Sequence, residues 1–201
     1  MMEENAASVL QFWFGDSADD ATVAARQAAL WWQKQAETDA MITARFEPLV
    51  KAAAAGTLAQ WSATPEGRLA LIILLDQFPR NMYRNMPQAF ACDPLARGLC
   101  LEGLDNGDDL RLRPIERVFF YLPLEHAEDA ALQAKSVELF EALDALTQGS
   151  GGANLSSYAE FARRHQRIID RFGRFPHRNA ILGRPSSDEE EAFLKTPGSS
   201  F

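Results

Sequence analysis

A basic segment late in the chain, residues 171–184 (RFGRFPHRNAILGR), carries side chains that could bind an anion. Its polar members are Arg171, Arg174, His177, Arg178, Asn179 and Arg184, with no carboxylate among them, in a chain of net charge −8. Arginine grips carboxylates and phosphates through a planar fork of donors. The segment therefore predicts one wall of an anion site. The alternatives are a solvated basic turn and a set of structural ion pairs.

A second candidate is Asp76, a carboxylate at the end of the most apolar run of the sequence. Arg68, Ile72 and Asp76 are spaced to share one face of a helix that we expect to be buried on nearly every side. A buried carboxylate needs a counter-charge, and Arg80 or Arg84 follows closely enough to supply it. Asp76 is therefore either an acid–base group or half of a structural Asp–Arg pair.

His165 is the second acid–base candidate because it lies on the inward stripe of a predicted helix. That stripe consists of Tyr158, Ala162, His165, Ile169 and Phe172, whose spacing alternates between four and three residues. An inward-facing histidine can exchange protons with a ligand. The other interpretation is a core histidine whose hydrogen bonds are all satisfied.

The string LEHAED, residues 124–129, places Glu125, His126, Glu128 and Asp129 together. Carboxylates and a histidine this close could hold a metal, but the Glu-x-x-His motif of helical carboxylate sites is missing. We expect the string to begin a helix, where the dipole favours acidic side chains, and we predict no metal ion. Glu125 and His126 remain candidates for ligand binding.

These clusters have complementary charge. Four carboxylates, on Asp76, Glu125, Glu128 and Asp129, can oppose three guanidiniums, on Arg171, Arg174 and Arg178. If every arginine is paired, the cluster is structural. If the arginines outnumber their partners, the surplus makes an anion site. Counting charges in the sequence leaves both possibilities open.

The elements that must position these groups are predicted to be helices throughout. The expected helices cover about 5–14, 19–35, 37–55, 65–78, 87–102, 114–123, 125–147 and 155–172, with a last short helix after Ser187. About eight to nine helices joined by short turns predict an all-α, antiparallel array that forms a single domain over residues 1–201. Residues 149–152 (GSGG) are interpreted as a surface loop.

Several boundaries have a local cause. Thr64 is a good N-cap and Pro65 suits a first helical position. Pro79 is expected to end that helix because proline cannot continue the backbone hydrogen bonds. Met41 is expected on the buried stripe of the third helix. Ser187 with Glu190 three residues later predicts a capping box.

The composition limits the class of protein. With 201 residues and 47% hydrophobic side chains, the chain can build a substantial core. Cys92 and Cys100 are too far apart on a helix for a disulfide, which indicates reduced thiols and a cytoplasmic location. The acidic N-terminus and the short apolar runs indicate neither a signal peptide nor a membrane span. Net acidity disfavours nucleic acid as a partner.

Long, unusual strings also occur together: VLQFWFG, a Trp pair at 31 and 32, GRLALIILLDQFPRNMYR, AFACD, FFYLPLEHAED, RFGRFPHRNAILGR and the tail FLKTPGSSF. In these strings, from about Val9 to Phe201, the chain resembles the DUF924 family of bacterial-type proteins in the tetratricopeptide-like helical superfamily. The resemblance implies antiparallel helix pairs and supplies no reaction, cofactor or catalytic residue. The 34-residue tetratricopeptide pattern is missing, so the resemblance concerns the arrangement of helices and does not imply peptide binding.

Two functions fit the residues. The first is a cleft that binds, or acts on, a small anionic metabolite; Asp76 and His165 are its catalytic candidates, and its binding candidates are Arg80, Glu125, His126, Arg171, Arg174, His177, Arg178 and Asn179. The second is a tetratricopeptide-like scaffold that binds a protein or an acidic peptide, with the polar clusters serving only as struts. No phosphate-loop, serine-hydrolase, zinc-protease or dinucleotide motif appears. We therefore assign no reaction, cofactor or oligomeric state.

Overall fold

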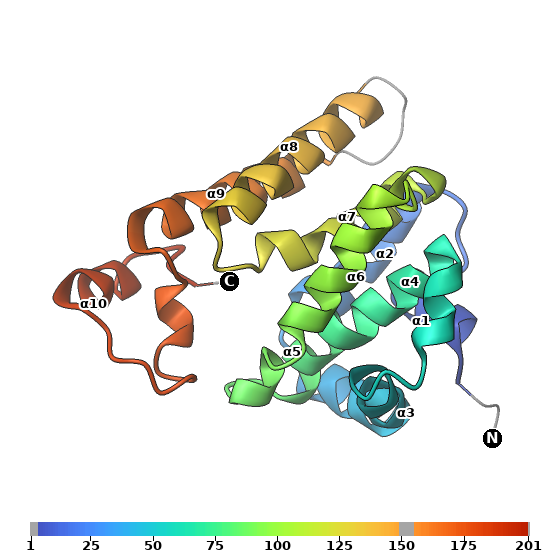
Figure 1. Cartoon of the computed structure of the whole chain (residues 1–201), viewed down its shortest axis with the longest axis horizontal. Coiled ribbons are helices and arrows are strands. Elements are labelled where there is room, and N and C mark those ends of the chain that lie inside the picture. Colours follow the sequence, from blue (N-terminus) through green and yellow to red (C-terminus); the bar gives the residue numbers. More distant parts are fainter. Residues whose placement is uncertain (1–3, 149–154, 201) are drawn as a thin grey trace.

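The computed structural model describes residues 4–148 and 155–200 and is helical in all its regular elements (Figure 1). The α-helices are α1 (Ala6–Phe14), α2 (Asp20–Trp32), α3 (Ala36–Ala54), α4 (Pro65–Ile72), α5 (Phe78–Met82), α6 (Asp93–Asp105), α7 (Pro114–Glu125), α8 (Ala130–Thr147), α9 (Ser156–Phe172) and α10 (Asp188–Leu194). Since α4 and α5 form one continuous rod, the described residues make nine helices. The predicted all-α array is confirmed, and the loop at 149–152 lies outside the described residues.

The local rules placed several helix starts correctly. The hydroxyl of Thr64 accepts a hydrogen bond from the backbone N–H of Gly67 at the start of α4, with Pro65 at the first position. Ser187 and Glu190 form the expected capping box of α10. These contacts satisfy N–H groups that have no partner within the helix, so the cap residues can be recognised from a few neighbouring letters.

Pro79 does not end the central helix, contrary to the sequence prediction. The helix widens into a π-turn, η2 (Ile73–Gln77), and continues as α5 to Met82. Within the π-turn the backbone N–H of Phe78 donates to the carbonyl of Ile73, five residues earlier. Burial of the apolar side chains around this rod outweighs the hydrogen bond that Pro79 cannot make.

The helix predicted to begin at Glu125 begins later. Helix α7 continues through Pro123 to Glu125, and α8 starts at Ala130 with the side chain of Asp129 as its N-cap. Residues 126–129 therefore form a turn. Glu125 closes α7, and only Asp129 has the helix-start role expected for the acidic string.

The main core joins every helix from α1 to α9, and aromatic side chains fill its centre. Phe119 contacts Trp13 and Trp31, with ring centroids 5.5 and 4.7 Å apart. On α3 the buried stripe includes Ile42, whereas Met41 is 45% exposed, so its predicted burial was wrong. Ile42, Phe46 and Val50 follow one another at four-residue intervals on the face of α3 that meets the core, and Met41 lies one position away from that face.

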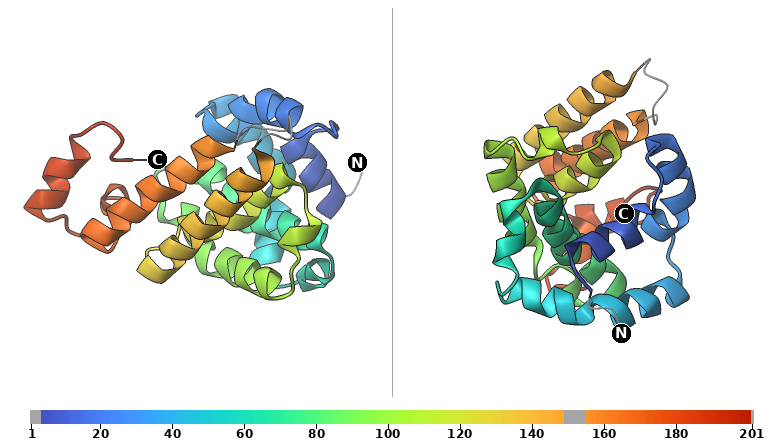
Figure 2. Two further views of the ribbon diagram at one scale, coloured as in Figure 1. Left: turned by 90° about the horizontal axis from the view of Figure 1, so that it is seen from above. Right: turned by 90° about the vertical axis from the view of Figure 1, so that its right-hand side faces the viewer.

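Residues 173–200 form a C-terminal arm at one end of the molecule, beyond the antiparallel pair α8 and α9 (Figures 1 and 2). A second, small apolar cluster joins the end of α9 to the arm. Ile168, Ile169 and Phe175 are buried in this cluster, and Phe172 and Phe193 pack against them. The arm includes the short 3-10 helix η5 (Pro176–Arg178). No helix in the described ranges is long and apolar enough to cross a bilayer.

Candidate functional site

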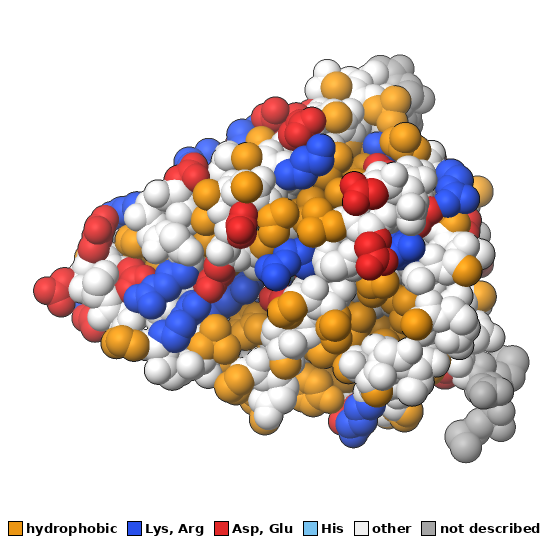
Figure 3. Space-filling view, viewed as in Figure 1, with side chains coloured by type: hydrophobic (Ala, Val, Ile, Leu, Met, Phe, Trp, Pro, Cys, Tyr) orange, Lys and Arg blue, Asp and Glu red, His pale blue; other side chains and the backbone are white. Residues whose placement is uncertain are grey.

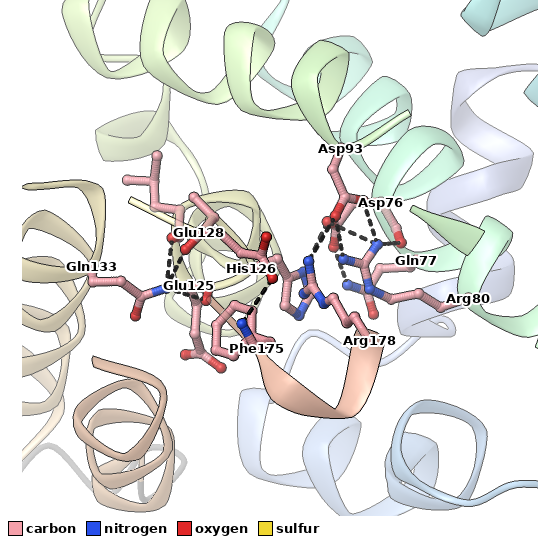
Figure 4. A network of polar contacts seen from close by, with 12 residues as sticks. Asp76, Gln77, Arg80, Asp93, Glu125, His126, Glu128, Gln133, Phe175 and Arg178 are labelled. Atoms are coloured by element: carbon pink, nitrogen blue, oxygen red, sulfur yellow. Dashed lines mark hydrogen bonds and ion pairs between the residues drawn. The ribbon is translucent and has the colours of Figure 1, made fainter. Parts of the chain in front are cut away.

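Six elements bring buried polar side chains together where the arm meets the helical core (Figure 4). We call this group the polar cluster. Its members are Asp76 on η2, Arg80 on α5, Asp93 at the start of α6, Glu125 and His126 at the end of α7, His165 on α9, and His177 and Arg178 on η5.

Asp76 is fully buried and surrounded by donors. Its carboxylate accepts hydrogen bonds from Gln77 Nε2 at 2.5 Å and from His126 Nδ1 at 2.8 Å, and Arg80 Nη1 lies 3.3 Å away. Burial raises the pKa of Asp76, but the charge of Arg80 and the contact with His126 outweigh burial and hold it well below the ordinary value. Asp76 is therefore an ion at neutral pH.

The π-turn supplies part of this geometry. π-Turns are rare, occur often at functional sites, and rotate the side chains that follow them relative to a regular α-helix. The backbone carbonyl of Asp76 accepts from Arg80 Nη1 at 2.6 Å, so one guanidinium serves both the carboxylate and the main chain. The sequence gives no local sign of the turn except Pro79 inside an otherwise continuous apolar helix.

His126 is oriented as a proton acceptor. A carboxylate only accepts hydrogen bonds, so the proton in the contact between His126 and Asp76 belongs to Nδ1, which leaves Nε2 with a free lone pair. Burial and the nearby Arg80 lower the pKa of His126, and the opposing effect of Asp76 is smaller. His126 is therefore neutral at pH 7, and its side chain keeps 14% of its surface exposed to solvent.

Arg80 forms the strongest ion pair of the cluster. Its two terminal nitrogens lie 2.9 and 3.0 Å from the two oxygens of Asp93, which is the bidentate geometry preferred by arginine. Burial lowers the pKa of Arg80, but the charges of Asp76 and Asp93 outweigh burial and raise the pKa above its ordinary value. The side chains of Arg80 and Asp93 are 20% and 17% exposed, so this pair lies at an edge that solvent reaches.

Arg178 is buried but weakly compensated. Its guanidinium packs between the rings of Phe90 and Phe175, 4.7 and 4.6 Å from their centroids, and its contact with Asp93 is long, 3.5 Å. Its Nε makes no hydrogen bond within the part of the chain that the structure describes. Burial and the neighbouring Arg80 lower the pKa of Arg178 to about 10.

His165 lies deeper and belongs to a different pair. Its Nδ1 lies 3.1 Å from Glu125 Oε1 and 2.9 Å from the carbonyl of Phe161. Burial lowers the pKa of His165 to about 3, while burial and the charge of Asp76 raise the pKa of Glu125 to about 8. Both side chains are neutral at pH 7. The inward orientation predicted for His165 is confirmed, but the histidine that contacts Asp76 is His126.

The arm is held against the bundle by Glu128. Its carboxylate accepts hydrogen bonds from two nitrogens of Arg184, at 2.6 and 2.9 Å, and from the backbone N–H of Phe175 at 2.8 Å. Asn179 is fully buried and supports the same arm, since its side-chain oxygen accepts from Arg184 Nε at 3.0 Å. These contacts fix the position of η5, and therefore of Arg178.

Three predicted binding residues lie outside the polar cluster: Asn179, whose side chain contacts Arg184 within the arm, and Arg171 and Arg174. Arg171 pairs with Glu189, and Arg174 forms a bidentate pair with Glu190. Both carboxylates belong to α10, which the sequence analysis did not count among the partners. Arginine side chains consequently form a band with interspersed carboxylates over the arm, which Figure 3 shows on the left of the molecule. The binding role expected of Arg171 and Arg174 stays a prediction.

One member of the cluster, Asp93, was not predicted from the sequence, nor were Phe90 and Gln77, which contact members of the cluster. Asp93 precedes Pro94, opens α6 and also pairs with Arg80. Phe90 is the aromatic neighbour of Arg178. Within residues 4–148 and 155–200, no group of three or more His, Cys, Asp or Glu side chains is arranged to hold a metal ion.

The fold and the site define an all-helical protein with a buried cluster of arginine, histidine and carboxylate side chains. The chain belongs to DUF924, a family described as bacterial protein of unknown function, whose model matches residues 9–198. Its fold is similar to the structure of a protein of unknown function from Agrobacterium tumefaciens, with a TM-score of 0.80 and 38% sequence identity; the match covers 94% of this chain and 96% of that chain. No curated protein matches the chain.

Proposed function

We propose that the polar cluster binds a small anionic ligand through a carboxylate or phosphate group that contacts Arg178. The observation that carries this proposal is the weak compensation of this buried guanidinium. The guanidinium of arginine has five N–H donors, and among the described residues the guanidinium of Arg178 makes one ion pair, at 3.5 Å. A buried cation in this state gains more from an anion than a solvated one does.

The neighbours of Arg178 favour the same ligand class. Arg80 and His126 border the cluster and are partly exposed, so an anion can approach from solvent. The flanking rings of Phe90 and Phe175 keep the guanidinium plane fixed and lower the polarity around it, which strengthens an ion pair formed there. These features support the binding of a small anionic metabolite at the polar cluster.

The test is ligand-induced stabilisation with simple anions. Sulfate, inorganic phosphate and acetate are added to the purified protein, and thermal unfolding and isothermal titration calorimetry are measured. An anion at about 100 times its dissociation constant adds about 2.7 kcal/mol of stability, or roughly 5 to 10 °C for a chain of this size.

Two variants make the test specific to the cluster. Arg178→Met keeps an apolar stem between the two phenylalanine rings but removes the charge, and we expect it to lose the shift. Arg171→Ala removes an equal charge from a pair whose side chains are 51% and 63% exposed, and we expect it to keep the shift. Anion binding that survives Arg178→Met, or no binding to the wild-type protein, would refute the proposal.

The scaffold alternative has one observation in its favour. Arg164, Arg167 and Arg171 line a hollow of about 230 Å³ together with Phe172 and Phe193. The pairs that Arg167 and Arg171 form with glutamates are surface pairs, which contribute little and can be exchanged for a partner's carboxylates. A short polyglutamate peptide should then bind, and Arg171→Ala should weaken that binding whereas Arg178→Met should not.

A cytoplasmic location stays a proposal as well. It is supported by Cys92 and Cys100, which are both free thiols. Burial raises the pKa of the Cys100 thiol, so this thiol stays protonated and unreactive. Thiol titration of the native protein should accordingly count at most one reactive cysteine, Cys92.

A further inference from the structure

Building on the anion site proposed above, we infer that the polar cluster takes up one proton together with its anion and that His126 holds this proton. The anion is therefore bound in effect as an acid. The inference deepens the proposed function, because it states how binding at this site is regulated. It depends on the charges that the fold has brought into contact.

The charges of the cluster balance before any ligand binds. Arg80 and Arg178 each contribute one positive charge, and Asp76 and Asp93 each contribute one negative charge. Glu128 has its own partner, Arg184, at the edge of the arm. An anion that enters would leave the cluster with one uncompensated negative charge, which is costly in a buried environment.

His126 can supply the missing positive charge. Its Nδ1–H already donates to the carboxylate of Asp76 at 2.8 Å, so a proton added at Nε2 creates an imidazolium in contact with a fixed anion. A carboxylate beside a histidine favours the protonated form of the histidine. The exposed part of the ring gives the proton a route from solvent.

In the unliganded protein, positive neighbours oppose this protonation. Arg80 on α5 faces His126 and lowers its pKa, and Arg178 on η5 adds to the positive charge of the cluster. Asp76 on η2 and Asp93 on α6 act in the opposite direction. An anion seated on the two guanidiniums cancels their field, so the pKa of His126 rises when the anion binds.

The other titratable groups around His126 are poor acceptors of this proton. His165 on α9, whose ring centroid is 6.3 Å from that of His126, is buried and pairs with Glu125. Burial and the adjacent Arg178 lower the pKa of His177 on η5 to about 4. Glu125, on the same helix as His126, already carries its proton at neutral pH because its pKa is about 8.

Linkage gives the sign of the pH dependence. The anion-bound form holds a proton that the free form lacks, so affinity falls as pH rises between the free-state and bound-state pKa values of His126. The free-state pKa lies below the ordinary value of about 6.5. We expect affinity to weaken about tenfold for each pH unit above it until the bound-state pKa is reached.

The experiment measures the affinity and the proton uptake of the full-length protein with acetate and formate, two monovalent anions that keep their charge between pH 6 and 8.5. Calorimetry is run in bis-Tris and in Tris at the same pH with chloride as counter-ion. The difference in heat between two buffers of unlike ionisation enthalpy counts the protons taken up. We expect about one proton per anion at pH 7 and a dissociation constant that rises with pH.

Variants then identify the proton acceptor. His126→Asn keeps a donor for Asp76 but cannot take up a proton, and we expect it to bind the anion with no proton uptake and no pH dependence. His126→Asn that retains the pH dependence, or loss of the dependence in His177→Asn or His165→Asn instead, would overturn the assignment. Wild-type binding without proton uptake refutes the coupling alone, whereas no binding at any pH refutes the anion site itself.

Discussion

At the scale of single residues, Asp76 shows how an ion is kept inside an apolar helix. Three side chains surround its carboxylate, and the structure provides them from the next residue, the next turn of the same rod, and the end of α7. Desolvation alone would neutralise the group. Removal of any one of these three partners is therefore expected to lower the free energy of unfolding of the protein.

We predict that Asp76→Asn destabilises the protein by about 3 kcal/mol at pH 7, because it removes one of the two carboxylates that compensate Arg80 and the charged acceptor of the His126 Nδ1–H. The folded-state pKa of Asp76 is depressed, so its stabilisation is present above the unfolded-state value of about 3.9 and is lost as pH falls below it. Urea unfolding of both proteins at pH 7 and pH 3.5 measures this. Asp170→Asn, at an exposed position of α9, is the matched control and should change little.

Glu125 gives the opposite pH dependence. Its pKa is raised to about 8, so the folded state holds a proton that the unfolded state releases near pH 4.5. Stability from this group falls as pH rises between these values. We predict that Glu125→Gln is nearly neutral at pH 4.5 and stabilises by about 4 kcal/mol at pH 8, since each unit of pKa shift corresponds to about 1.4 kcal/mol. A variant equally stable or less stable than wild type at pH 8 would contradict a raised pKa of Glu125 in the folded protein.

At the scale of elements, two glycines of α6 differ in the space around them. A Cβ added at Gly103 would lie 2.4 Å from Phe120 Cζ and 2.6 Å from Arg68 Cδ, whereas one added at Gly98 would meet nothing within 4 Å. We predict that Gly103→Ala destabilises by about 2 kcal/mol through overpacking. Gly98→Ala should stabilise by up to about 1 kcal/mol through helix propensity. Denaturant unfolding of the two variants compares them directly.

The arm is an element whose attachment depends mainly on one carboxylate. Glu128 accepts from Arg184 and from the backbone of Phe175, and it is only about a quarter exposed. We predict that Glu128→Gln lowers the local opening free energy of the arm by about 2 kcal/mol, which speeds amide exchange in residues 174–184 about 30-fold. Glu189→Gln, which breaks an exposed pair, should leave the exchange rates within about twofold.

If amide exchange in residues 174–184 is as slow in Glu128→Gln as in the wild-type protein, the small apolar cluster around Phe175 holds the arm and the ion pair does not. In that case Arg178 would keep its position, and the anion affinity of this variant would equal that of the wild-type protein. The two measurements together therefore test whether the arm positions the site.

At the scale of the whole molecule, one core joins the helices. Among the described residues, buried side chains form a continuous cluster from Val9 on α1 to Ala162 on α9, and a second, small cluster joins the end of α9 to the arm. We predict a single calorimetric unfolding transition whose calorimetric and van 't Hoff enthalpies agree. A separate low-temperature transition would indicate that the arm unfolds independently of the helical core.

Much of the fold could be predicted because its causes are local. Helix starts at Thr64 and Ser187 depend on a cap within three residues, and the inward orientation of His165 depends on a periodic stripe of one helix. The errors at Pro79 and at the start of α8 have a common reason. Both positions lie beside buried apolar segments, where tertiary packing outweighs the local preference of proline or of an acidic run.

The sequence by itself determined the helical class and the side chains available for chemistry. Only the tertiary structure decided which charges meet. His126 contacts Asp76 across 50 residues, and Arg184 contacts Glu128 across 56. The attraction between two charges depends on their distance in space and not on their separation in the sequence. Which arginine pairs with which carboxylate is therefore decided by packing. In the folded chain Arg171, Arg174 and Arg184 each pair with a glutamate, whereas the guanidinium of Arg178 has one long contact, with Asp93.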